Sequence, residues 1–162
     1  AQTLAETGAP PERICLEITE SALMHDLEHS IQVLRSLRDL GVGIAVDDFG
    51  TGYSSLSYLK RLPASVLKID GSFIAGLGRD ERDRAIVESV VNLASTLHQS
   101  AVAEGVETRT QVDVLTEMGC PMAQGYYFGR PVDASEIDRY SSAVDITPTE
   151  PIGLVEAHER TR

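Results

Sequence analysis

Short apolar segments alternate with longer segments of helical periodicity along most of the chain. The short segments are rich in β-branched residues and have the length of strands, whereas the longer ones repeat apolar residues every three or four positions, as an amphipathic helix does. The pattern predicts strands at residues 14–19, 43–48, 66–70, 101–106 and 123–128. It predicts helices at residues 4–7, 27–40, 54–62, 82–98 and 108–118.

Two of the predicted helices show which side should face a core. Residues 27–40 repeat Leu27, Ile31, Leu34 and Leu37 on one side, and Gly41 follows as a stop signal. Residues 82–98 repeat Ile86, Val90, Leu93 and Leu97. We expect each of these stripes to pack against the sheet.

Strands that alternate with helices predict parallel βαβ units and an α/β fold. An open doubly wound sheet gathers its ligand residues mainly at one switch point, whereas a TIM-like (β/α)8 barrel gathers them from many strands around one mouth. Here every predicted strand has polar residues near its end, namely Glu17, Glu20, Asp47, Asp48, Lys68, Asp70, Glu104, Glu107 and Gln124. We therefore predict an incomplete TIM-like (β/α)8 barrel with about five βα units, and we expect about three further strands upstream.

Composition and charge narrow the classes of function. The 162 residues carry a net charge of −11, which disfavours polymeric DNA or RNA as a partner, because these backbones require a basic surface. No stretch approaches the roughly 18 consecutive apolar residues of a membrane span. Cys15 and Cys120 fit neither a zinc motif nor a disulfide framework. We expect reduced thiols, with Cys15 buried in its strand, in a cytoplasmic protein or in the cytoplasmic part of a membrane-anchored one.

The alternation of strands and helices stops after Tyr140. We predict a globular portion at residues 1–140 and a solvated tail or linker at residues 141–162, which contains the sequence Thr-Pro-Thr-Glu-Pro at 147–151.

The adjacent pair Asp47 and Asp48 is the first candidate for chemistry, because it ends an apolar strand beside the strand that carries Glu17. Neighbouring strand residues point to opposite sides, so both carboxylates reach one site only where the strand gives way to the turn at residues 49–52. Carboxylate oxygens favour Mg²⁺ or Mn²⁺, and two such ions need a bridging carboxylate. We predict a two-metal site here. The alternative is that the acidic pair only caps a following helix.

Lys68 is a cation inside an otherwise apolar strand, so it needs a carboxylate or a phosphate as a partner. Asp70 lies two residues on and shares its face, and the two could form a purely structural pair. Glu104 ends another apolar strand, where the alternative is a solvated strand end.

Two further patterns carry less weight. The triplet Asp48-Phe49-Gly50 also occurs in protein kinases, but the chain has no kinase catalytic loop or glycine-rich nucleotide loop. His25 and His29 have the spacing of a helical metal pair, yet no third ligand lies nearby in the sequence. We expect both histidines on an exposed helix face.

Five short motifs occur in an order that resembles one known family. They are Glu-Ile-Thr-Glu at 17–20, Asp-Asp-Phe-Gly-Thr-Gly-Tyr-Ser-Ser-Leu at 47–56, Lys-Ile-Asp at 68–70, Ala-Glu-Gly-Val-Glu at 103–107 and Gln-Gly-Tyr at 124–126. From about Leu4 to Tyr140 the chain resembles the EAL-domain cyclic-di-GMP phosphodiesterases. The resemblance implies a TIM-like barrel with one antiparallel strand. It also implies metal-dependent hydrolysis of cyclic di-GMP to the linear dinucleotide pGpG, in bacterial signalling.

The resemblance implies a role for each matched residue. Glu17, Asp47 and Asp48 correspond to metal ligands, and Glu104 to a general base or a ligand of the second metal. Lys68 corresponds to the lysine that contacts the attacking water. Supporting roles fall to Glu20, which would brace the loop at residues 49–55, and to Asp70, Glu107 and Gln124, which would support the site or contact substrate.

The family's Glu-x-Leu segment and its metal-binding asparagine would precede Ala1. We therefore expect residues 1–140 to be the C-terminal portion of an EAL domain and to be inactive alone, whereas the complete domain is expected to be an active homodimer. A sensory or diguanylate-cyclase-like domain is expected upstream. The alternative is an EAL domain that binds cyclic di-GMP as a sensor without cleaving it.

Overall fold

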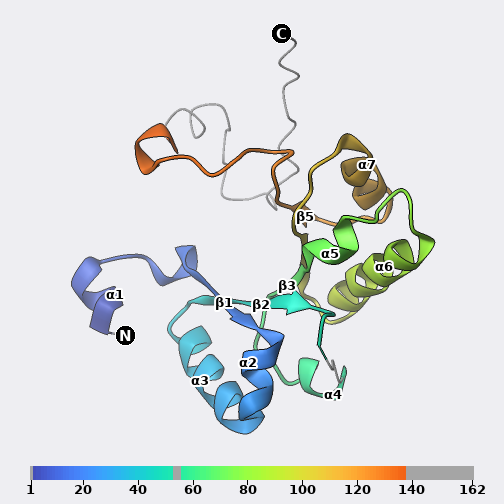
Figure 1. Cartoon of the computed structure of the whole chain (residues 1–162). Coiled ribbons are helices and arrows are strands. Elements are labelled where there is room, and N and C mark those ends of the chain that lie inside the picture. Colours follow the sequence, from blue (N-terminus) through green and yellow to red (C-terminus); the bar gives the residue numbers. More distant parts are fainter. Residues whose placement is uncertain (1, 53–55, 138–162) are drawn as a thin grey trace.

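The computed structural model describes residues 2–52 and 56–137. Its centre is a parallel sheet of five strands in chain order (Figure 1). The strands are β1 (Cys15–Thr19), β2 (Gly43–Phe49), β3 (Val66–Ile69), β4 (Ser100–Ala103) and β5 (Met122–Ala123). The α-helices are α1 (Gln2–Thr7), α2 (Glu20–His25), α3 (Leu27–Asp39), α4 (Leu56–Leu59), α5 (Gly71–Ile74), α6 (Glu81–Thr96) and α7 (Arg109–Glu117). Two short 3₁₀ helices are η1 (Pro11–Arg13) and η2 (Ala134–Glu136).

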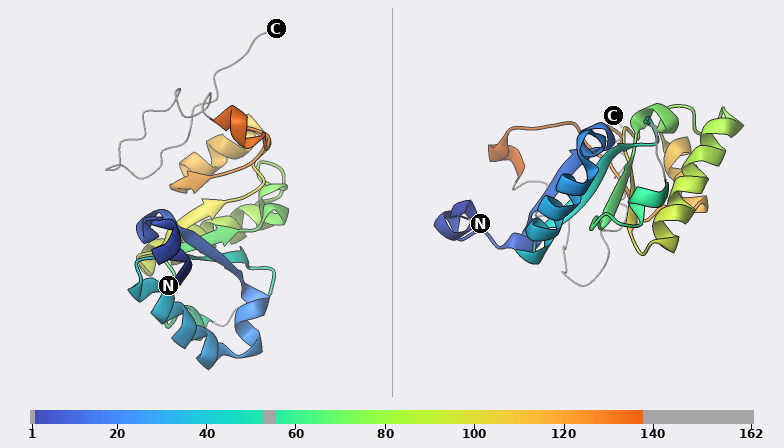
Figure 2. Two further views of the ribbon diagram at one scale, coloured as in Figure 1. Left: turned by 90° about the vertical axis from the view of Figure 1, so that its left-hand side faces the viewer. Right: turned by 90° about the horizontal axis from the view of Figure 1, so that it is seen from below.

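The order of the strands decides between the two architectures. Each strand pairs in parallel with the one before it. Because crossovers between parallel strands are right-handed, repeating the same step leaves the connecting helices on one side of the sheet. A doubly wound sheet would instead reverse its strand order at a switch point. Figures 1 and 2 show α3 and α6 along the outer side of the strands. The predicted α/β fold, an incomplete TIM-like barrel, is confirmed.

Side chains alternate between the two faces of the sheet. The face toward the helices is apolar and buried, with Val46, Leu67, Ile69, Ala101 and Ala103 all 0–2% exposed. The register places these residues side by side, since Val46 pairs with Leu67, and Leu67 with Ala101. The core therefore lies between the sheet and the helices. The opposite face, which is the inner face of a barrel, is left for polar groups.

Several predicted boundaries differ from the structure. The fourth strand spans Ser100–Ala103 instead of residues 101–106, and the fifth has two residues instead of six. Both shorten because the chain turns away early, at Gly105 (φ +67°) and Gly125 (φ +156°). The helix predicted at residues 54–62 is observed as Leu56–Leu59, and residues 53–55 lie outside the described residues. The predicted tail at residues 141–162 also lies outside them.

The two predicted helix stripes have different outcomes. In α3, Ile31 and Leu34 are buried, and Leu27 and Leu37 pack against them as predicted. In α6, Val90 is buried and Leu93 and Leu97 pack against the core as predicted, whereas Ile86 is 38% exposed. The buried side of α6 also includes Val87, Val91 and Ala94, so it is wider than the predicted stripe. Periodicity alone does not fix the angular width of a buried stripe.

Cysteine placement corrects one prediction. Cys120 is buried, but Cys15 is exposed on β1, because β1 is an edge strand of the described sheet and Cys15 lies on the polar face with Glu17. Within residues 2–52 and 56–137, no helix has both the length and the apolar content that crossing a bilayer requires.

Gln111 fixes the loop between β4 and α7, which follows Glu104. Its side-chain oxygen accepts hydrogen bonds from the backbone N–H groups of Glu107 (2.7 Å) and Thr108 (2.8 Å), and its Nε2 donates to the carbonyl of Ile74 (3.0 Å). The hydroxyl oxygen of Thr108 accepts a hydrogen bond from the N–H of Gln111, which completes a capping box. The side chain of Gln111 therefore satisfies three backbone groups while it is itself only 5% exposed.

We predict that Gln111→Met lowers the free energy of unfolding by about 2–3 kcal/mol, because it leaves buried backbone groups without partners. The measurement is the urea midpoint of the purified chain. The control is Gln32→Met, the same chemical change on the exposed side of α3, which we expect to alter stability by less than about 0.5 kcal/mol. Equal midpoints for the two variants would contradict the role of Gln111.

Candidate metal and catalytic site

Lys68 on β3 lies at the centre of a group of carboxylates on the polar face of the sheet. Its side chain is 8% exposed. Nζ donates a hydrogen bond to Glu17 Oε2 at 2.6 Å, and it lies 2.8 Å from Glu104 Oε1 and 2.9 Å from Asp47 Oδ1. One ammonium therefore contacts carboxylates from three other chain segments.

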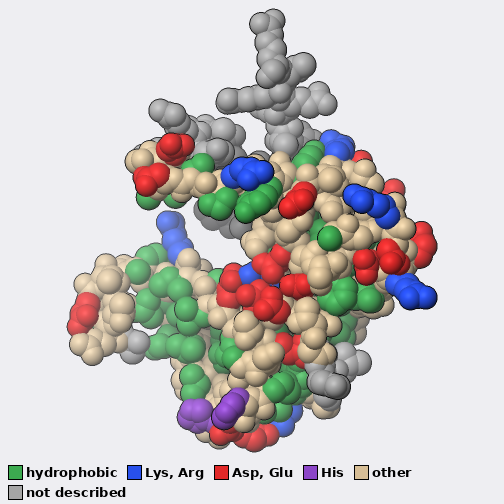
Figure 3. Space-filling view, viewed as in Figure 1, with side chains coloured by type: hydrophobic (Ala, Val, Ile, Leu, Met, Phe, Trp, Pro, Cys, Tyr) green, Lys and Arg blue, Asp and Glu red, His purple; other side chains and the backbone are tan. Residues whose placement is uncertain are grey.

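The register of the parallel strands brings these residues together. Glu17 belongs to β1, Asp47 to β2 and Lys68 to β3, and Glu104 follows directly after β4, where its N–H donates to the carbonyl of Ile69 (3.1 Å). Parallel strands end at the same edge, so residues from four strand ends can share one site. Figure 3 shows Asp and Glu side chains gathered over the ends of these strands.

Asp47 and Asp48 are consecutive, yet both reach this site because β2 is irregular there. The pairing of β2 with β3 shifts register between Val46 and Phe49, and Asp48 has φ +53°. A left-handed non-glycine residue costs about 1 kcal/mol or more, and such strain is typical of functional positions. We predicted that the strand must give way for both carboxylates to meet, and it does so. The break lies inside β2, however, and not in the turn at residues 49–52.

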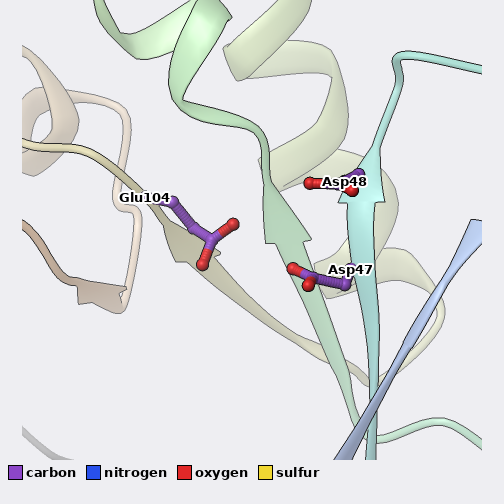
Figure 4. A group of neighbouring side chains, drawn as sticks. All are labelled: Asp47, Asp48 and Glu104. Carbon is purple, nitrogen blue, oxygen red and sulfur yellow. The ribbon is translucent and has the colours of Figure 1, made fainter.

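The arrangement of the carboxylates fits a divalent cation. One oxygen from each of Asp47, Asp48 and Glu104 lies within 4.8 Å of the other two, and Figure 4 shows Asp47 and Glu104 pointing toward each other across β3. Within the described part of the chain, the buried Asp47 Oδ1 faces the Lys68 ammonium at 2.9 Å and has no other donor. The remaining lone pairs of this carboxylate are available to a metal ion.

The charges of the site also favour a divalent cation. Glu17, Asp47, Asp48 and Glu104 together carry four negative charges when ionised, and Lys68 offsets one of them. Three negative charges close together are repulsive unless cations compensate them. Glu17 lies outside the group that could share one ion, with its carboxylate hydrogen-bonded to Lys68 and its side chain 51% exposed. Its role as a metal ligand stays a prediction.

The protonation of Lys68 and Glu104 follows from this crowding. Burial by itself lowers the pKa of the Lys68 ammonium, but hydrogen bonds to Glu104, Glu17 and Asp47 outweigh it, so that the net pKa is raised. Lys68 is therefore charged at neutral pH. For Glu104, burial raises the pKa, and the hydrogen bond and charge of Lys68 oppose this effect only in part.

The predicted supporting residues fall into different places. Gln124 Nε2 donates to Glu104 Oε1, the oxygen that also contacts Lys68, so Gln124 belongs to the site. Asp70 does not pair with Lys68, because its carboxylate caps α5 by accepting from the N–H of Ser72 (2.9 Å) and from the Ser72 hydroxyl. These hydrogen bonds lower the pKa of Asp70. Glu107 is exposed, and its backbone N–H is held by Gln111.

Glu20 is the first residue of α2 and is only 2% exposed. Its Oε1 accepts from the hydroxyl of Tyr58 (3.0 Å), and its Oε2 accepts from the N–H of Gly50 (3.4 Å). A Cβ at Gly52 would lie 3.1 Å from the Glu20 carboxylate, so the loop passes close to it. Glu20 therefore contacts both sides of the loop that we predicted it to brace.

The alternative interpretations of these residues do not hold. Asp47 and Asp48 lie within β2, and the next helix among the described residues is α4, so they cap no helix. Glu104 is not a freely solvated strand end, since its side chain is 16% exposed and contacts Lys68. His25 ends α2 and His29 lies in α3, so the two are not one helical pair, although both are exposed as predicted.

A model of the EAL domain family matches residues 1–131. The chain belongs to the EAL domain family. Its relatives include the bifunctional diguanylate cyclase/cyclic di-GMP phosphodiesterase MucR of Pseudomonas aeruginosa, which is 53% identical over 127 residues, or 78% of this chain. The cyclic di-GMP phosphodiesterase NbdA of the same organism is 44% identical over 137 residues, or 85% of this chain. The EAL domain described here spans 18% of the length of each of these two relatives.

Solved EAL structures share the fold of this domain. The structure of the MucR phosphodiesterase in complex with c-di-GMP superimposes with a TM-score of 0.81 and 50% identity, over 84% of this chain and 55% of that one. A manganese and cyclic-di-GMP complex of Klebsiella pneumoniae BlrP1 gives a TM-score of 0.75 and 35% identity, over 80% of this chain and 33% of that one.

Sequence reasoning missed three residues of this EAL domain that hold predicted residues or their loops in place. Gln111 follows Thr108 by three positions, which is the spacing of a capping box and was visible in the sequence. Ser72, two residues after Asp70, has the spacing of a local side-chain cap. Tyr58 gave no such signal, because its contact with Glu20 depends on how the intervening loop folds.

We predict that Lys68→Met destabilises the metal-free domain by about 1–3 kcal/mol. Breaking a fully buried ion pair costs about 3–5 kcal/mol, and the partial exposure of the carboxylates reduces this figure. The loss should shrink when Mn²⁺ is added, because the cation replaces the charge of the ammonium. The measurement is the urea midpoint in EDTA and in Mn²⁺. Lys60→Met, at an exposed lysine, is the control, and equal effects of the two variants would show that Lys68 does not hold the cluster.

We predict that Tyr58→Phe increases amide hydrogen exchange at Gly50 about tenfold, because Glu20 loses the hydroxyl that orients its carboxylate. Exchange is followed by NMR. Tyr126→Phe is the matched control, since Tyr126 is 54% exposed. Unchanged exchange at Gly50 in the Tyr58 variant would refute the bracing of this loop by Glu20 and Tyr58.

Proposed function

We propose that the protein containing this EAL domain hydrolyses one phosphodiester bond of cyclic di-GMP to give linear pGpG, with Mg²⁺ or Mn²⁺ as its cofactor. The observation that carries this proposal is the group of carboxylates around Lys68, at the ends of four parallel strands. The printed names of MucR and NbdA and the c-di-GMP complex of MucR support the substrate.

Asp47, Asp48 and Glu104 are the residues that would hold a cation, and we propose Glu17 as a further ligand in a two-metal site. The BlrP1 complexes with manganese and with calcium support a divalent ion bound by oxygen ligands. A bound Mg²⁺ or Mn²⁺ would make water acidic enough to attack near neutral pH and would offset negative charge on the phosphate.

Lys68 and Glu104 would have different roles in the reaction, one as a hydrogen-bond donor and the other as a proton acceptor. The Lys68 ammonium, already surrounded by carboxylates, can donate a hydrogen bond to the attacking water or to a phosphate oxygen, but it has no lone pair with which to accept a proton. Glu104 can accept the proton of the water as the new P–O bond forms and the bond to the 3′ oxygen breaks, and the leaving oxygen takes a proton from solvent to become the 3′ hydroxyl of pGpG. The amide of Gln124 holds Glu104 in position for this step.

The remaining roles concern support and context. We propose that Glu20 couples the loop at residues 49–55 to the site, and that Asp70 and Glu107 support the site or contact substrate. We also propose a homodimer, located in the cytoplasm or in the cytoplasmic part of a membrane-anchored protein. We further propose that a sensory or diguanylate-cyclase-like domain lies upstream. The two activities in the name of MucR support this upstream domain.

The test is Asp47→Asn in a protein that contains a complete EAL domain, since this chain covers 55% of the solved MucR phosphodiesterase. We expect the formation of pGpG, followed by chromatography in Mn²⁺ or Mg²⁺, to fall at least about 100-fold, because a neutral amide is a weak ligand and leaves the cation poorly held. Binding of Mn²⁺ should weaken in parallel. Asp39→Asn, at an exposed residue at the end of α3, should leave both unchanged.

Two results would contradict the proposal. Normal turnover in the Asp47 variant would remove this carboxylate from the reaction. Tight binding of cyclic di-GMP by the unaltered protein without any pGpG in either metal would favour the alternative, an EAL domain that senses the nucleotide without cleaving it.

A further inference from the structure

A cavity lies at the other end of the strands from the carboxylate group. Its volume is about 260 Å³. It is formed where the chain enters β3 and β4 and where α3 and α4 end, and its lining includes Arg38, Lys60, Ser65, His98 and Gln99 along with the apolar residues Leu59, Leu62, Pro63, Ala64 and Leu97. None of these residues belongs to the site proposed above.

His98 has an unusual backbone for its place in the fold. The helices α3, α6 and α7 end in the same turn, in which one residue takes a left-handed conformation and two backbone N–H groups bond back into the last turn. Glycine fills this position after α3 (Gly41, φ +93°) and after α7 (Gly119, φ +70°). After α6 it is filled by His98, at φ +57°. A side chain here carries a conformational cost that glycine avoids, and backbone strain of this kind is typical of functional positions.

Gln99 adds an unused acceptor to the cavity. Its Nε2 donates to the carbonyl of Ala64 at 3.0 Å, which fixes the orientation of the amide, because the side-chain oxygen could not donate in that place. Its Oε1 is buried and has no hydrogen-bond partner among the described residues. A buried acceptor of this kind favours a ligand or water that brings an N–H or O–H group.

Two charged side chains, Arg38 and Lys60, lie at this cavity in a chain whose net charge is −11. Arg38, Lys60 and His98 line it. In residues 2–52 and 56–137, no carboxylate lies within ion-pair distance of Lys60 or His98. Arg38 makes one contact of 3.6 Å with its neighbour Asp39, and both side chains are more than half exposed. Such a surface pair is weak and leaves the guanidinium available.

We propose that this cavity binds a small organic anion that carries a phosphate or carboxylate group. Arg38 and Lys60 pair with the anionic group, and His98 donates an imidazole N–H to it. Gln99 Oε1 accepts a hydrogen bond from a hydroxyl or amine of the ligand, and the leucines and Pro63 contact its carbon atoms. The volume is just below the range of about 300–1,000 Å³ of drug-sized ligands, so the ligand is smaller than these. The site is separate from the carboxylate group, and its test needs neither metal nor cyclic di-GMP.

The experiment is a titration of the ¹⁵N-labelled chain in EDTA with inorganic phosphate, with citrate and with neutral glycerol. We expect saturable shifts of the amide signals of Ser65, His98 and Gln99 with phosphate or citrate, and none with glycerol. A response to phosphate alone would identify the ligand class as phosphate esters, and a response to citrate alone as carboxylates. Shifts that grow without saturation, or that appear only at residues around Lys68, would overturn the proposal.

Two variants separate binding from folding. His98→Gly removes the imidazole and relieves the left-handed backbone, so we expect a raised Tm together with a dissociation constant increased at least tenfold. Arg38→Gln should weaken binding at least threefold, whereas Arg35→Gln, with the same loss of charge on an exposed part of α3, should not. Unchanged affinity in His98→Gly, or equal effects of the two arginine variants, would overturn the site.

Discussion

The contact between Lys68 Nζ and the carboxylates of Glu17, Asp47 and Glu104 is the interaction on which the polar face of the sheet depends. Charged groups at the ends of four parallel strands would otherwise repel one another, because the strands hold them at fixed spacing. The ammonium compensates part of this charge, and a divalent cation would have to compensate the rest. The same side chain therefore stabilises the metal-free fold and leaves the site attractive to a cation.

The positions of the carboxylates depend on irregular backbone and on side chains that bond to it. The register shift and the left-handed Asp48 turn two consecutive residues toward one site. Gln111 holds the loop that follows Glu104, and Gln124 holds the carboxylate of Glu104 itself. Glu20 and Tyr58 do the same for the loop after β2. The sheet provides the common edge, and these few polar contacts set the geometry at that edge.

The sequence predicted the parallel strands and the charged residues at their ends, because each depends on local patterns. Asp47, Lys68 and Glu104 end or interrupt apolar segments, and a charge in such a place needs partners at the same edge. The partners themselves could not be predicted, because they depend on register and on the twist of the sheet. Lys68 contacts Glu17, Asp47 and Glu104. Asp70 instead caps α5. The predicted stripe of α6 was right except at Ile86, because a neighbouring stripe that includes Val87, Val91 and Ala94 has the same periodicity and is also buried. The role of Gln111 could have been predicted, because Thr108 and Gln111 have the spacing of a capping box.

The burial of Lys68 also decides how the domain reacts with labelling reagents. The chain has two lysine side chains, Lys60 and Lys68. Lys68 is 6% exposed and surrounded by carboxylates, so its amine is protonated and shielded from electrophiles. Lys60 is exposed and lines the cavity at the other end of the strands. Of these two amines, an acylating dye would therefore modify Lys60, and it would place a probe beside that cavity while the carboxylate group stays unmodified.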